Sequence, residues 1–489
     1  MALPEFIEIV PLDKPIRAEI TVPGSKSITN RALILAALAE GETTLEGALW
    51  SEDTEVMVES LRDLGFMVNL ETDPNEPCNR TITVYGKGGV VPSGGTESQP
   101  LDLFVGNAGT AARFLAAFVC LGTGVYRLHG VPRMHDRPQA ELFSALRQLG
   151  YHIESENNNE KLPAKITVAA SSGVASRLGL QGGRPAGAAA GCSVRIGQSS
   201  QFASALMLCA QAGNWNVRIE GENAEESPYV VMTSELIKVF PKQGGTFRIE
   251  PDASSGSYFL AAELLVPRVY SEGLEYSLHW KMDVETTLFS KVSVAHWPTS
   301  GWQADQRFPN VITWIQHTAI RDFAKDPGTP DQVKTQMRIL YPDGQISRKK
   351  HLGDSIMTAI ILAPFAESQI QFTDLGRLRV QECERVVALK SELTKCGAKV
   401  LETGDTLEVF PSQLHGAEIE TYNDHRMAMC FAILGLKIPG IKIKNPACVK
   451  KTFPNFFQKL AEPPPHGLGT TIRDAATGRA LGPAELFAQ

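Results

Sequence analysis

Loops rich in Gly, Ser and Asp run directly into strongly apolar stretches six times along the chain. Each stretch is apolar on nearly every side of a helix, which is typical of helices buried in a protein interior. Ser, Thr, Asp or Asn stands where an N-cap belongs, and Ala-rich turns let helices approach closely. The pattern predicts six buried helices, within residues 23–41, 106–120, 197–211, 252–265, 353–366 and 423–436.

A second kind of pattern follows most of these stretches. Apolar residues recur with helical spacing on one side only, which predicts surface helices at 51–65, 137–150, 228–240 and 385–397. Three of the four end in Gly, the residue preferred just beyond a helix C-terminus. Short runs with strand character lie between the helices, at 81–86, 165–170, 217–221 and 407–411, and the N-terminal ten residues alternate like a strand.

The repeated unit is therefore strand, buried helix, strand, surface helix, strand. About six such units predict an α/β protein with two domains of three units, each with buried helices at its centre and sheets around them. Residues 266–351 break the pattern with an irregular stretch that contains Trp and Pro, and we interpret them as an insertion. The tail after Leu460 reads as a loosely attached extension.

Composition and charge exclude several classes of protein. The 489 residues carry a net charge of −7, which argues against a nucleic-acid or membrane-surface binder, since either needs a basic face. The longest apolar stretches fall short of the roughly 18 residues of a membrane span, and no secretory signal is visible, so we expect a cytoplasmic protein. Eight scattered cysteines without a CxxC pair predict reduced thiols, with neither a disulfide framework nor a zinc site.

Cations gather in the loops that precede the predicted buried helices. If these helices run parallel, their N-termini meet at one end of each domain and form a surface suited to anions. A single cation near a helix start is usually part of a weak surface ion pair. The whole set, at equivalent points of a repeat, favours phosphate or carboxylate ligands instead. The set comprises Lys26, Arg31, Arg113, Arg133, Arg137, Arg385, Arg426 and the pair Lys450–Lys451.

Two carboxylates are candidates for proton transfer. Asp354 opens a predicted buried helix, and Glu382 lies between Arg379 and Arg385 in the sequence. Asp354 could equally be a helix cap and Glu382 an ordinary salt-bridge partner. A carboxylate near several cations should have a lowered pKa, which suits a base better than an acid. Residues 23–27 resemble the end of a P-loop but lack its first glycine, and dinucleotide and metal-ligand motifs are not found.

Taken together, the loops resemble the signature segments of the 5-enolpyruvylshikimate-3-phosphate (EPSP) synthase family. The matching segments, in the family's order, are PGSKSITNRALILAALAEG, LFVGNAGTAARFLAA, GVPRMHDRP, SSQFASALM, DASSGSYFLAA and TYNDHRMAMCFAI…KTFPNFF. The resemblance implies a two-domain inside-out α/β barrel of six βαβαββ units, with the chain crossing twice between domains. The first domain would hold residues 1–24 and 250–462, the second 25–249, with 463–489 as an extension. Substrates would bind in the cleft and draw the domains closed.

The implied reaction moves the enolpyruvyl group of phosphoenolpyruvate to the 5-hydroxyl of shikimate 3-phosphate, without metal or organic cofactor, in a monomer. By resemblance, the phosphoenolpyruvate residues are Lys26, Gly109, Arg137, Gln201, Arg385, Arg426 and Lys451. The proton-transfer carboxylates are Asp354 and Glu382, and Lys26 touches both ligands. The shikimate 3-phosphate residues that match are Ser27, Arg31, Ser199, Ser200, Gln201, Tyr229 and Asp354. Glyphosate, which occupies the phosphoenolpyruvate site in the family, should inhibit because Gly109 leaves that space open.

Three positions depart from the family's pattern, all on the acceptor side. Gln381 stands where the family has lysine, Arg377 where it has asparagine, and Glu226 where it has a phosphate-binding serine. If residues 377–382 form an extended strand, 377 and 381 share one face, and Arg377 could return the missing charge; Ser227 could replace the missing hydroxyl. The chain is then an ordinary synthase with a rearranged acceptor pocket, a transferase for a related cyclic alcohol, or a binding homologue without turnover. The retained phosphoenolpyruvate residues favour the first.

Overall fold

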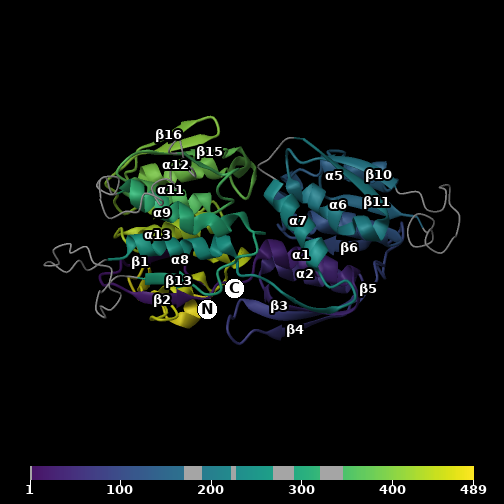
Figure 1. Cartoon of the computed structure of the whole chain (residues 1–489), viewed down its shortest axis with the longest axis horizontal. Helices are drawn as coiled ribbons and strands as arrows, with labels where there is room; N and C mark the ends of the chain where they lie inside the picture. Colours follow the sequence, from purple (N-terminus) through teal and green to yellow (C-terminus); the bar gives the residue numbers. More distant parts are fainter. Residues whose placement is uncertain (1–2, 170–189, 222–226, 268–290, 320–344, 489) are drawn as a thin grey trace, which may run out of the picture. The chain divides into compact units, whose positions relative to one another are not determined.

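A computed structural model describes residues 3–169, 190–221, 227–267, 291–319 and 345–488. The chain divides into two compact units (Figure 1). Unit 1 contains Met1–Val22 and Pro251–Gln489, and unit 2 contains Pro23–Glu250. Both units mix helices and strands in the order that the sequence patterns predict.

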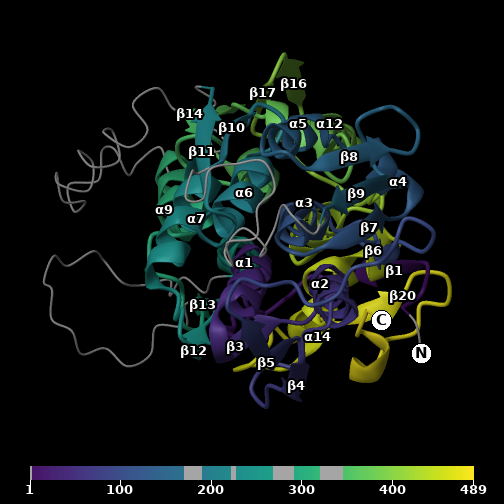
Figure 2. The ribbon, with the colours of Figure 1, turned by 90° about the vertical axis from the view of Figure 1, so that its right-hand side faces the viewer.

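Unit 2 is built on three mutually packed helices, α1, α3 and α6. All three are largely buried, as their all-round apolar sequences predict. Strands and further helices surround them (Figure 2). The helices are α1 (Lys26–Leu38), α2 (Glu52–Asp63), α3 (Gly109–Phe118), α4 (Pro132–Asp136), α5 (Ala140–Gln148), α6 (Ser200–Gly213) and α7 (Ser227–Val239). The strands are β3 (Glu40–Leu49), β4 (Val68–Thr72), β5 (Asn79–Lys87), β6 (Leu101–Phe104), β7 (Gly124–His129), β8 (His152–Ser155), β9 (Ala164–Val168), β10 (Ala190–Arg195), β11 (Trp215–Glu220) and β12 (Gly245–Arg248).

The sheets of unit 2 reveal the internal repeat. One sheet has the order β12-β3-β5-β4 and another the order β6-β7-β9-β8. In both, the first two strands pair in parallel and the remaining pairs are antiparallel. A third sheet pairs β10 with β11 in parallel. A parallel pair needs a crossover, and the buried helices α3 and α6 lie in the β6–β7 and β10–β11 crossovers.

Unit 1 repeats this plan around the mutually packed helices α8, α11 and α13. Its two larger sheets have the orders β14-β15-β17-β16 and β18-β19-β1-β20, and β13 pairs with β2. The helices are α8 (Ala253–Leu265), α9 (Phe308–Ala319), α11 (Ile356–Leu362), α12 (Arg385–Lys395), α13 (His425–Gly435) and α14 (Phe456–Ala461). The strands are β1 (Phe6–Ile9), β2 (Arg17–Ile20), β13 (Lys291–Val294), β14 (Gln345–Ser347), β15 (Ile370–Thr373), β16 (Val400–Thr403), β17 (Thr406–Val409), β18 (Glu418–Ile419), β19 (Ile441–Lys444) and β20 (Ile472–Asp474).

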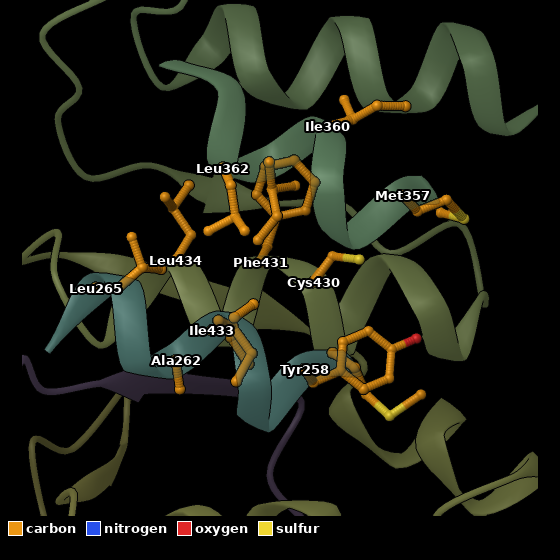
Figure 3. Close-up of a cluster of buried hydrophobic side chains, with 14 of the residues drawn as sticks. Tyr258, Ala262, Leu265, Met357, Ile360, Leu362, Cys430, Phe431, Ile433 and Leu434 are labelled. Carbon is orange, nitrogen blue, oxygen red and sulfur yellow. The ribbon is translucent and has the colours of Figure 1, made fainter. Parts of the chain in front are cut away.

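The core of unit 1 lies between its three central helices. Leu265 of α8, Ile360 of α11 and Phe431 of α13 are among the buried side chains (Figure 3). Burying a side chain of this size stabilises the fold by about 1.5–3 kcal/mol. The small residues of α8 and α13, such as Ala262, let these helices pack closely. The packed core holds the three central helices in place. Several charged side chains described below lie near the N-termini of these helices.

Part of the predicted insertion belongs to this unit. Residues 291–319, assigned to an insertion from their irregular composition, contain β13, which pairs in parallel with β2. They also contain α9, which packs against α8 and contributes the buried residues Phe308 and Val311. The insertion prediction is wrong for this segment, because its apolar residues complete the core of unit 1. Residues 268–290 and 320–344 lie outside the described part.

The prediction of a loose tail is also wrong. Strand β20 pairs with β1, and Leu468, Ile472, Leu481 and Leu486 are buried in the core of unit 1. The side-chain amide of Gln458 donates to the carbonyl of Pro483 at 2.6 Å. The sequence of the tail is rich in Pro and Gly, but its widely spaced leucines and isoleucine are sufficient to anchor it.

Candidate active site

A cluster of cations and carboxylates lies in unit 1, where several helices begin. We call it the charge cluster; it comprises Arg348, Asp354, Gln381, Glu382, Arg385, Asp424, Arg426 and Lys451. Arg348 and Asp354 come from the loop between β14 and α11, and Gln381 and Glu382 from the loop before α12. Arg385 begins α12, while Asp424 and Arg426 lie at the start of α13. The predicted grouping of cations at helix starts is therefore confirmed for Arg385 and Arg426, whereas Lys451 lies at the end of the 3₁₀ helix Pro446–Lys451.

Asp354 sits among four side chains that can donate hydrogen bonds. Arg348 Nη2 lies 3.1 Å from Asp354 Oδ1, and Gln381 Nε2 lies 3.4 Å from the same oxygen. The other oxygen, Oδ2, lies 3.2 Å from Arg426 Nε and 3.8 Å from Arg385 Nη1. The Asp354 side chain is 13% exposed. One carboxylate is thus held at both oxygens by residues from three separate segments.

Arg385 is the centre of the cluster and its side chain is fully buried. Its Nε lies 2.7 Å from Asp424 Oδ2, and its Nη2 lies 2.8 Å from Glu382 Oε2. Lys451 Nζ binds the other oxygen of Glu382 at 3.1 Å. Asp424 is itself the N-cap of α13, since it accepts the backbone N–H of Arg426 at 2.8 Å. The buried guanidinium of Arg385 thus holds three carboxylates around it, those of Asp354, Glu382 and Asp424.

The charges shift the pKa values of the cluster strongly. Burial disfavours the ionised form of Asp354, but the charges of Arg426, Arg348 and Arg385 outweigh burial and hold the pKa of Asp354 well below its usual value. Burial likewise works against the charge of Arg385, and Asp424, Glu382 and Asp354 reverse this, so the pKa of Arg385 is raised. Asp354 is therefore ionised, as the sequence predicted, and it is a weak base while all three arginines remain on it.

Asp305 fixes the backbone on both sides of Asp354, a role that the sequence reading missed. Its buried carboxylate accepts the backbone N–H groups of Gly353 at 2.7 Å and of Ser355 at 3.1 Å. It also accepts the hydroxyls of Ser355 and Ser254, the second at 2.5 Å. Since Ser254 lies in the first turn of α8, one carboxylate ties the start of that helix to the Asp354 loop. The placement of residue 305 in a presumed insertion concealed it.

In unit 2, three of the predicted phosphoenolpyruvate residues, Lys26, Gly109 and Gln201, lie at the starts of α1, α3 and α6, and Arg137 follows the end of α4. Lys26 Nζ lies 3.0 Å from Asp53 Oδ2, an ion pair that joins α1 to α2. Arg137 Nη1 donates to the carbonyl of Asn107 at 3.0 Å, beside the start of α3. Gln201 Nε2 donates to Thr110 Oγ1 at 3.1 Å, which links α6 to α3. These contacts join the start of α6 to that of α3 and the start of α1 to that of α2.

Gly109 lies under two guanidinium groups. A Cβ atom built on Gly109 would be 2.5 Å from Arg113 Nη1 and 2.6 Å from Arg137 Nη2. Arg113 Nη1 also donates to the carbonyl of Gly109 at 3.0 Å. The absence of a side chain at Gly109 is therefore required for the present position of Arg137. This reason for a glycine adds to the one expected from the sequence, which was space for the ligand.

The predicted acceptor residues of unit 2 include one fully engaged arginine. Arg31 Nε donates to Thr233 Oγ1 at 2.8 Å, Nη2 to Ser204 Oγ at 3.0 Å and Nη1 to the carbonyl of Ser27 at 2.8 Å. Burial lowers the pKa of Arg31 to about 10. Ser199 caps α6 by accepting the backbone N–H of Gln201, and Ser200 is buried beside it. Tyr229, one turn before Thr233 on α7, accepts that threonine's hydroxyl with its carbonyl at 2.7 Å.

The expected strand at residues 377–382 is wrong. Residues Gly376–Val380 form a 3₁₀ helix and Gln381 follows at its end. Residues 377 and 381 therefore do not share one face of a strand, and the geometric reason for pairing Arg377 with Gln381 is lost. Arg379 is engaged elsewhere, with Glu384, Glu402 and Asp405. Glu226, the third departure, lies outside the described residues.

One of the predicted cations, Arg133, forms an ordinary surface ion pair, which was the alternative interpretation for every cation in the set. Arg133 is exposed and lies 3.8 Å from Asp136. Conversely, Arg348, Asp424 and Asp53 were missed as partners of the predicted site residues. Asp424 lies in the NDHR segment and was passed over, while Arg348 begins the basic run RKK just before Asp354, a signal that could have found it.

Comparisons with known proteins identify the family of this chain. The model of the EPSP synthase (3-phosphoshikimate 1-carboxyvinyltransferase) family matches residues 11–241 and 291–460. A 3-phosphoshikimate 1-carboxyvinyltransferase of Trichormus variabilis is 35% identical over 477 residues, which cover 93% of this chain and 98% of the relative. That of Aeromonas salmonicida is 35% identical over 468 residues, covering 91% and 96%.

Solved structures show the same fold. An EPSP synthase structure from Acinetobacter baumannii superposes with a TM-score of 0.65 at 20% identity, covering 96% of this chain and all of that one. The enolpyruvyl transferase NikO from Streptomyces tendae gives a TM-score of 0.60 at 14% identity, covering 99% of this chain and all of that one. The predicted fold class, an inside-out α/β barrel in two domains, is confirmed.

The two units of central helices and surrounding sheets give an α/β protein with the same fold as these solved structures. The family match covers most of the chain, and the curated relatives match it almost end to end. The chain belongs to the EPSP synthase family. In the described part of the chain, every helix is too short or too polar to cross a bilayer.

Proposed function

We propose that this chain transfers the enolpyruvyl group of phosphoenolpyruvate to the 5-hydroxyl of shikimate 3-phosphate and releases phosphate. The observation that carries the proposal is the charge cluster. In it, buried Arg385 contacts both candidate proton-transfer carboxylates, with Glu382 at 2.8 Å and Asp354 at 3.8 Å. Family membership supports the chemistry, and the proposal is further supported by the short distances from one buried guanidinium to both carboxylates.

Phosphoenolpyruvate carries a carboxylate and a phosphate, so its site must offer several cations. Arg385, Arg426 and Lys451 are each paired with carboxylates of the chain itself. Before the substrate binds, these carboxylates avoid the cost of leaving buried cations unpaired. An arriving anionic substrate would then replace some of them as partners of the cations. From unit 2, the resemblance adds Lys26, Gly109, Arg137 and Gln201 to this set.

The reaction has two steps, and each moves one proton at carbon. In the addition, the 5-hydroxyl oxygen forms a bond to C2 of phosphoenolpyruvate, its proton passes to a base, and C3 gains a proton from an acid. In the elimination, the C2–O bond to phosphate breaks, C3 loses a proton, and the enol ether and phosphate remain. Asp354 and Glu382 are the groups we assign to these transfers, with Lys26 as a further catalytic residue that contacts both substrates.

Substrate binding also explains how Asp354 can become a useful base. While Arg426, Arg348 and Arg385 contact it, its pKa is too low for efficient proton abstraction. Transfer of Arg385 and Arg426 to the anionic substrate would weaken their pull on Asp354 and raise that pKa. Proton abstraction would then occur only in the presence of phosphoenolpyruvate.

The residues assigned to the acceptor are the reason for considering a second candidate function. We assign to shikimate 3-phosphate the residues Lys26, Ser27, Arg31, Ser199, Ser200, Gln201, Tyr229, Asp354, Arg377 and Gln381. Gln381 contacts Asp354 with a neutral amide in place of the family's lysine. This difference favours, as the second candidate, a transferase for a related cyclic alcohol. A homologue without turnover is less well supported, because both candidate carboxylates lie in the cluster.

A phosphate-release assay across acceptors separates these functions. Release from phosphoenolpyruvate is expected with shikimate 3-phosphate and not without an acceptor. Release with another cyclic alcohol alone would support the second candidate. Ligand binding without release for every acceptor would identify a homologue without turnover.

We also propose that the protein is a cytoplasmic monomer. Cell fractionation would check its location, and light scattering of the purified protein would check its oligomeric state.

A further inference from the structure

We propose that Arg348 is a positioning residue for Asp354 and supplies the positive charge that Gln381 lacks. The proposal rests on the proposed function, since it concerns the acceptor side of the same site. Arg348 is absent from the set of residues that the resemblance implies. What identifies it is its contact with the carboxylate assigned to proton transfer.

The geometry gives Arg348 and Gln381 one shared target. Arg348 Nη2 and Gln381 Nε2 both point to Asp354 Oδ1, at 3.1 Å and 3.4 Å. The Arg348 side chain is 2% exposed, so its charge acts on Asp354 with little screening by water. A lysine at position 381 would have brought its charge to this region. Here the amide of Gln381 is neutral, and the guanidinium beside it is charged.

The backbone around Arg348 is held firmly in place. Its N–H donates to the carbonyl of Thr373 at 3.1 Å, continuing the ladder between β14 and β15. Ser347 N–H donates to His351 Nδ1 at 2.9 Å, and Lys350 N–H donates to Ser347 Oγ at 3.0 Å. A side chain that starts from a fixed backbone loses less freedom when it binds, so Arg348 is well suited to orienting another group.

Arg348 differs from the other two arginines on Asp354. Arg385 and Arg426 contact Oδ2, and both are assigned to phosphoenolpyruvate. If the substrate draws them away, Arg348 remains on Oδ1 and keeps the carboxylate in place. Among the described residues, Asp354 pairs with Arg348 from its own loop, Arg385 from α12 and Arg426 from α13, and Asp305 holds the neighbouring backbone. Arg348 is the cation among them with no assigned role in phosphoenolpyruvate binding.

Four variants test this role: Arg348→Gln, Arg348→Lys, Arg377→Gln, and the double variant Arg348→Gln with Gln381→Lys. Arg348→Gln should raise the KM for shikimate 3-phosphate at least about tenfold, as expected for a lost charged hydrogen bond, and change the KM for phosphoenolpyruvate less. It should also move the acidic limb of the pH profile of kcat, which reports Asp354 in the substrate complex, to higher pH, because Asp354 loses a cation that favours its ionised form. Arg348→Lys should retain most activity, and Gln381→Lys in the double variant should restore the acceptor KM.

Exposed Arg473 on β20 provides the matched control, since Arg473→Gln removes the same charge at a surface position. Thermal unfolding of each variant shows whether it is folded. Equal damage from Arg348→Lys and Arg348→Gln, an unmoved acidic limb and no rescue by Gln381→Lys would overturn the proposal and leave Arg348 a purely structural residue. An unchanged acceptor KM in Arg348→Gln beside a large loss of acceptor affinity in Arg377→Gln would overturn it in favour of Arg377.

Shikimate 3-phosphate affinity, measured by calorimetry on the same proteins, separates this proposal from the proposed function. Binding without phosphate release by the unmutated protein would count against the function and still test Arg348 through the Kd values. Failure of the unmutated protein to bind shikimate 3-phosphate would overturn the acceptor-side role itself.

Discussion

The carboxylate of Asp305 accepts the backbone N–H of Gly353 at 2.7 Å, across 48 residues of sequence. The same oxygen accepts the N–H of Ser355, so the two neighbours of Asp354 are held by one buried group. A catalytic side chain needs a fixed backbone, because small misplacements lower the rate strongly. Asp305 therefore connects a segment far from the site in sequence to the position of a candidate catalytic residue.

Replacing Asp305 should affect both stability and rate. Asp305→Asn removes the charge that strengthens four hydrogen bonds, and we expect a loss of about 1–3 kcal/mol in the free energy of unfolding. With the Asp354 loop less well held, kcat should fall by roughly 10- to 100-fold. Urea unfolding and steady-state kinetics measure these two effects, with exposed Asp13→Asn as the control. Lower stability with an unchanged kcat would show that Asp305 does not position Asp354.

Adding a methyl group at Gly109 should displace Arg137. The new Cβ would be 2.6 Å from Arg137 Nη2, well inside the contact distance. Gly109→Ala should raise the KM for phosphoenolpyruvate roughly tenfold, equivalent to about 1.4 kcal/mol of binding, and relieve inhibition by glyphosate. Gly191→Ala is the matched control, because its Cβ would find its nearest neighbour at 4.0 Å. Glyphosate resistance of the unmutated protein would contradict the expectation that the space beside Gly109 admits this inhibitor.

The charge cluster should make the protein sensitive to acid. The pKa of Asp354 is lower in the folded protein than its ordinary value of 3.8, so its ionisation stabilises the fold above that value. This stabilisation is lost progressively as the pH falls below about 4, because Asp354 becomes protonated in the unfolded chain while it stays ionised in the folded protein. Urea unfolding between pH 7 and pH 3 should show a shallower loss for Asp354→Asn than for the unmutated protein. Parallel curves would mean that Asp354 has no depressed pKa.

Removing the tail should destabilise unit 1. Truncation after Glu462 deletes β20 and the buried residues Leu468, Ile472, Leu481 and Leu486. Each buried side chain contributes about 1.5–3 kcal/mol, so the loss should exceed several kcal/mol. Thermal unfolding measures it, and restoring residues 463–474 alone should recover part of the loss through the β20–β1 pairing. An unchanged Tm in the truncated protein would support a loosely attached tail after all.

Local patterns predicted the helices because their signals are contained in a few neighbouring residues. Gly65, Gly150 and Gly397, proposed as helix ends, all adopt the left-handed backbone that such positions require. Asp252 and Asp424 cap α8 and α13 with their side chains. The strand at 377–382 failed because alternation over six residues does not distinguish a strand from a 3₁₀ turn when no partner strand is known.

The charge cluster was predictable in part. Arg385 and Arg426 share a position at helix starts, and this repeated placement marked them before any contact was known. Lys451 was marked with them, although it ends the 3₁₀ helix Pro446–Lys451. Arg348 and Asp305 have no such common position. Their importance depends on which loops lie against Asp354, and that is a property of packing.

By itself, the sequence determined the repeated α/β units, their buried helices, the family and the cations and carboxylates on which its chemistry depends. These follow from hydrophobic period, capping residues and motif order, which are all short-range features. The tertiary structure decided which charges meet: Arg348 and Gln381 on one oxygen of Asp354, Asp305 on the flanking backbone, and the tail in the core of unit 1. Electrostatic and packing energies depend on distance and burial, which only the folded chain fixes.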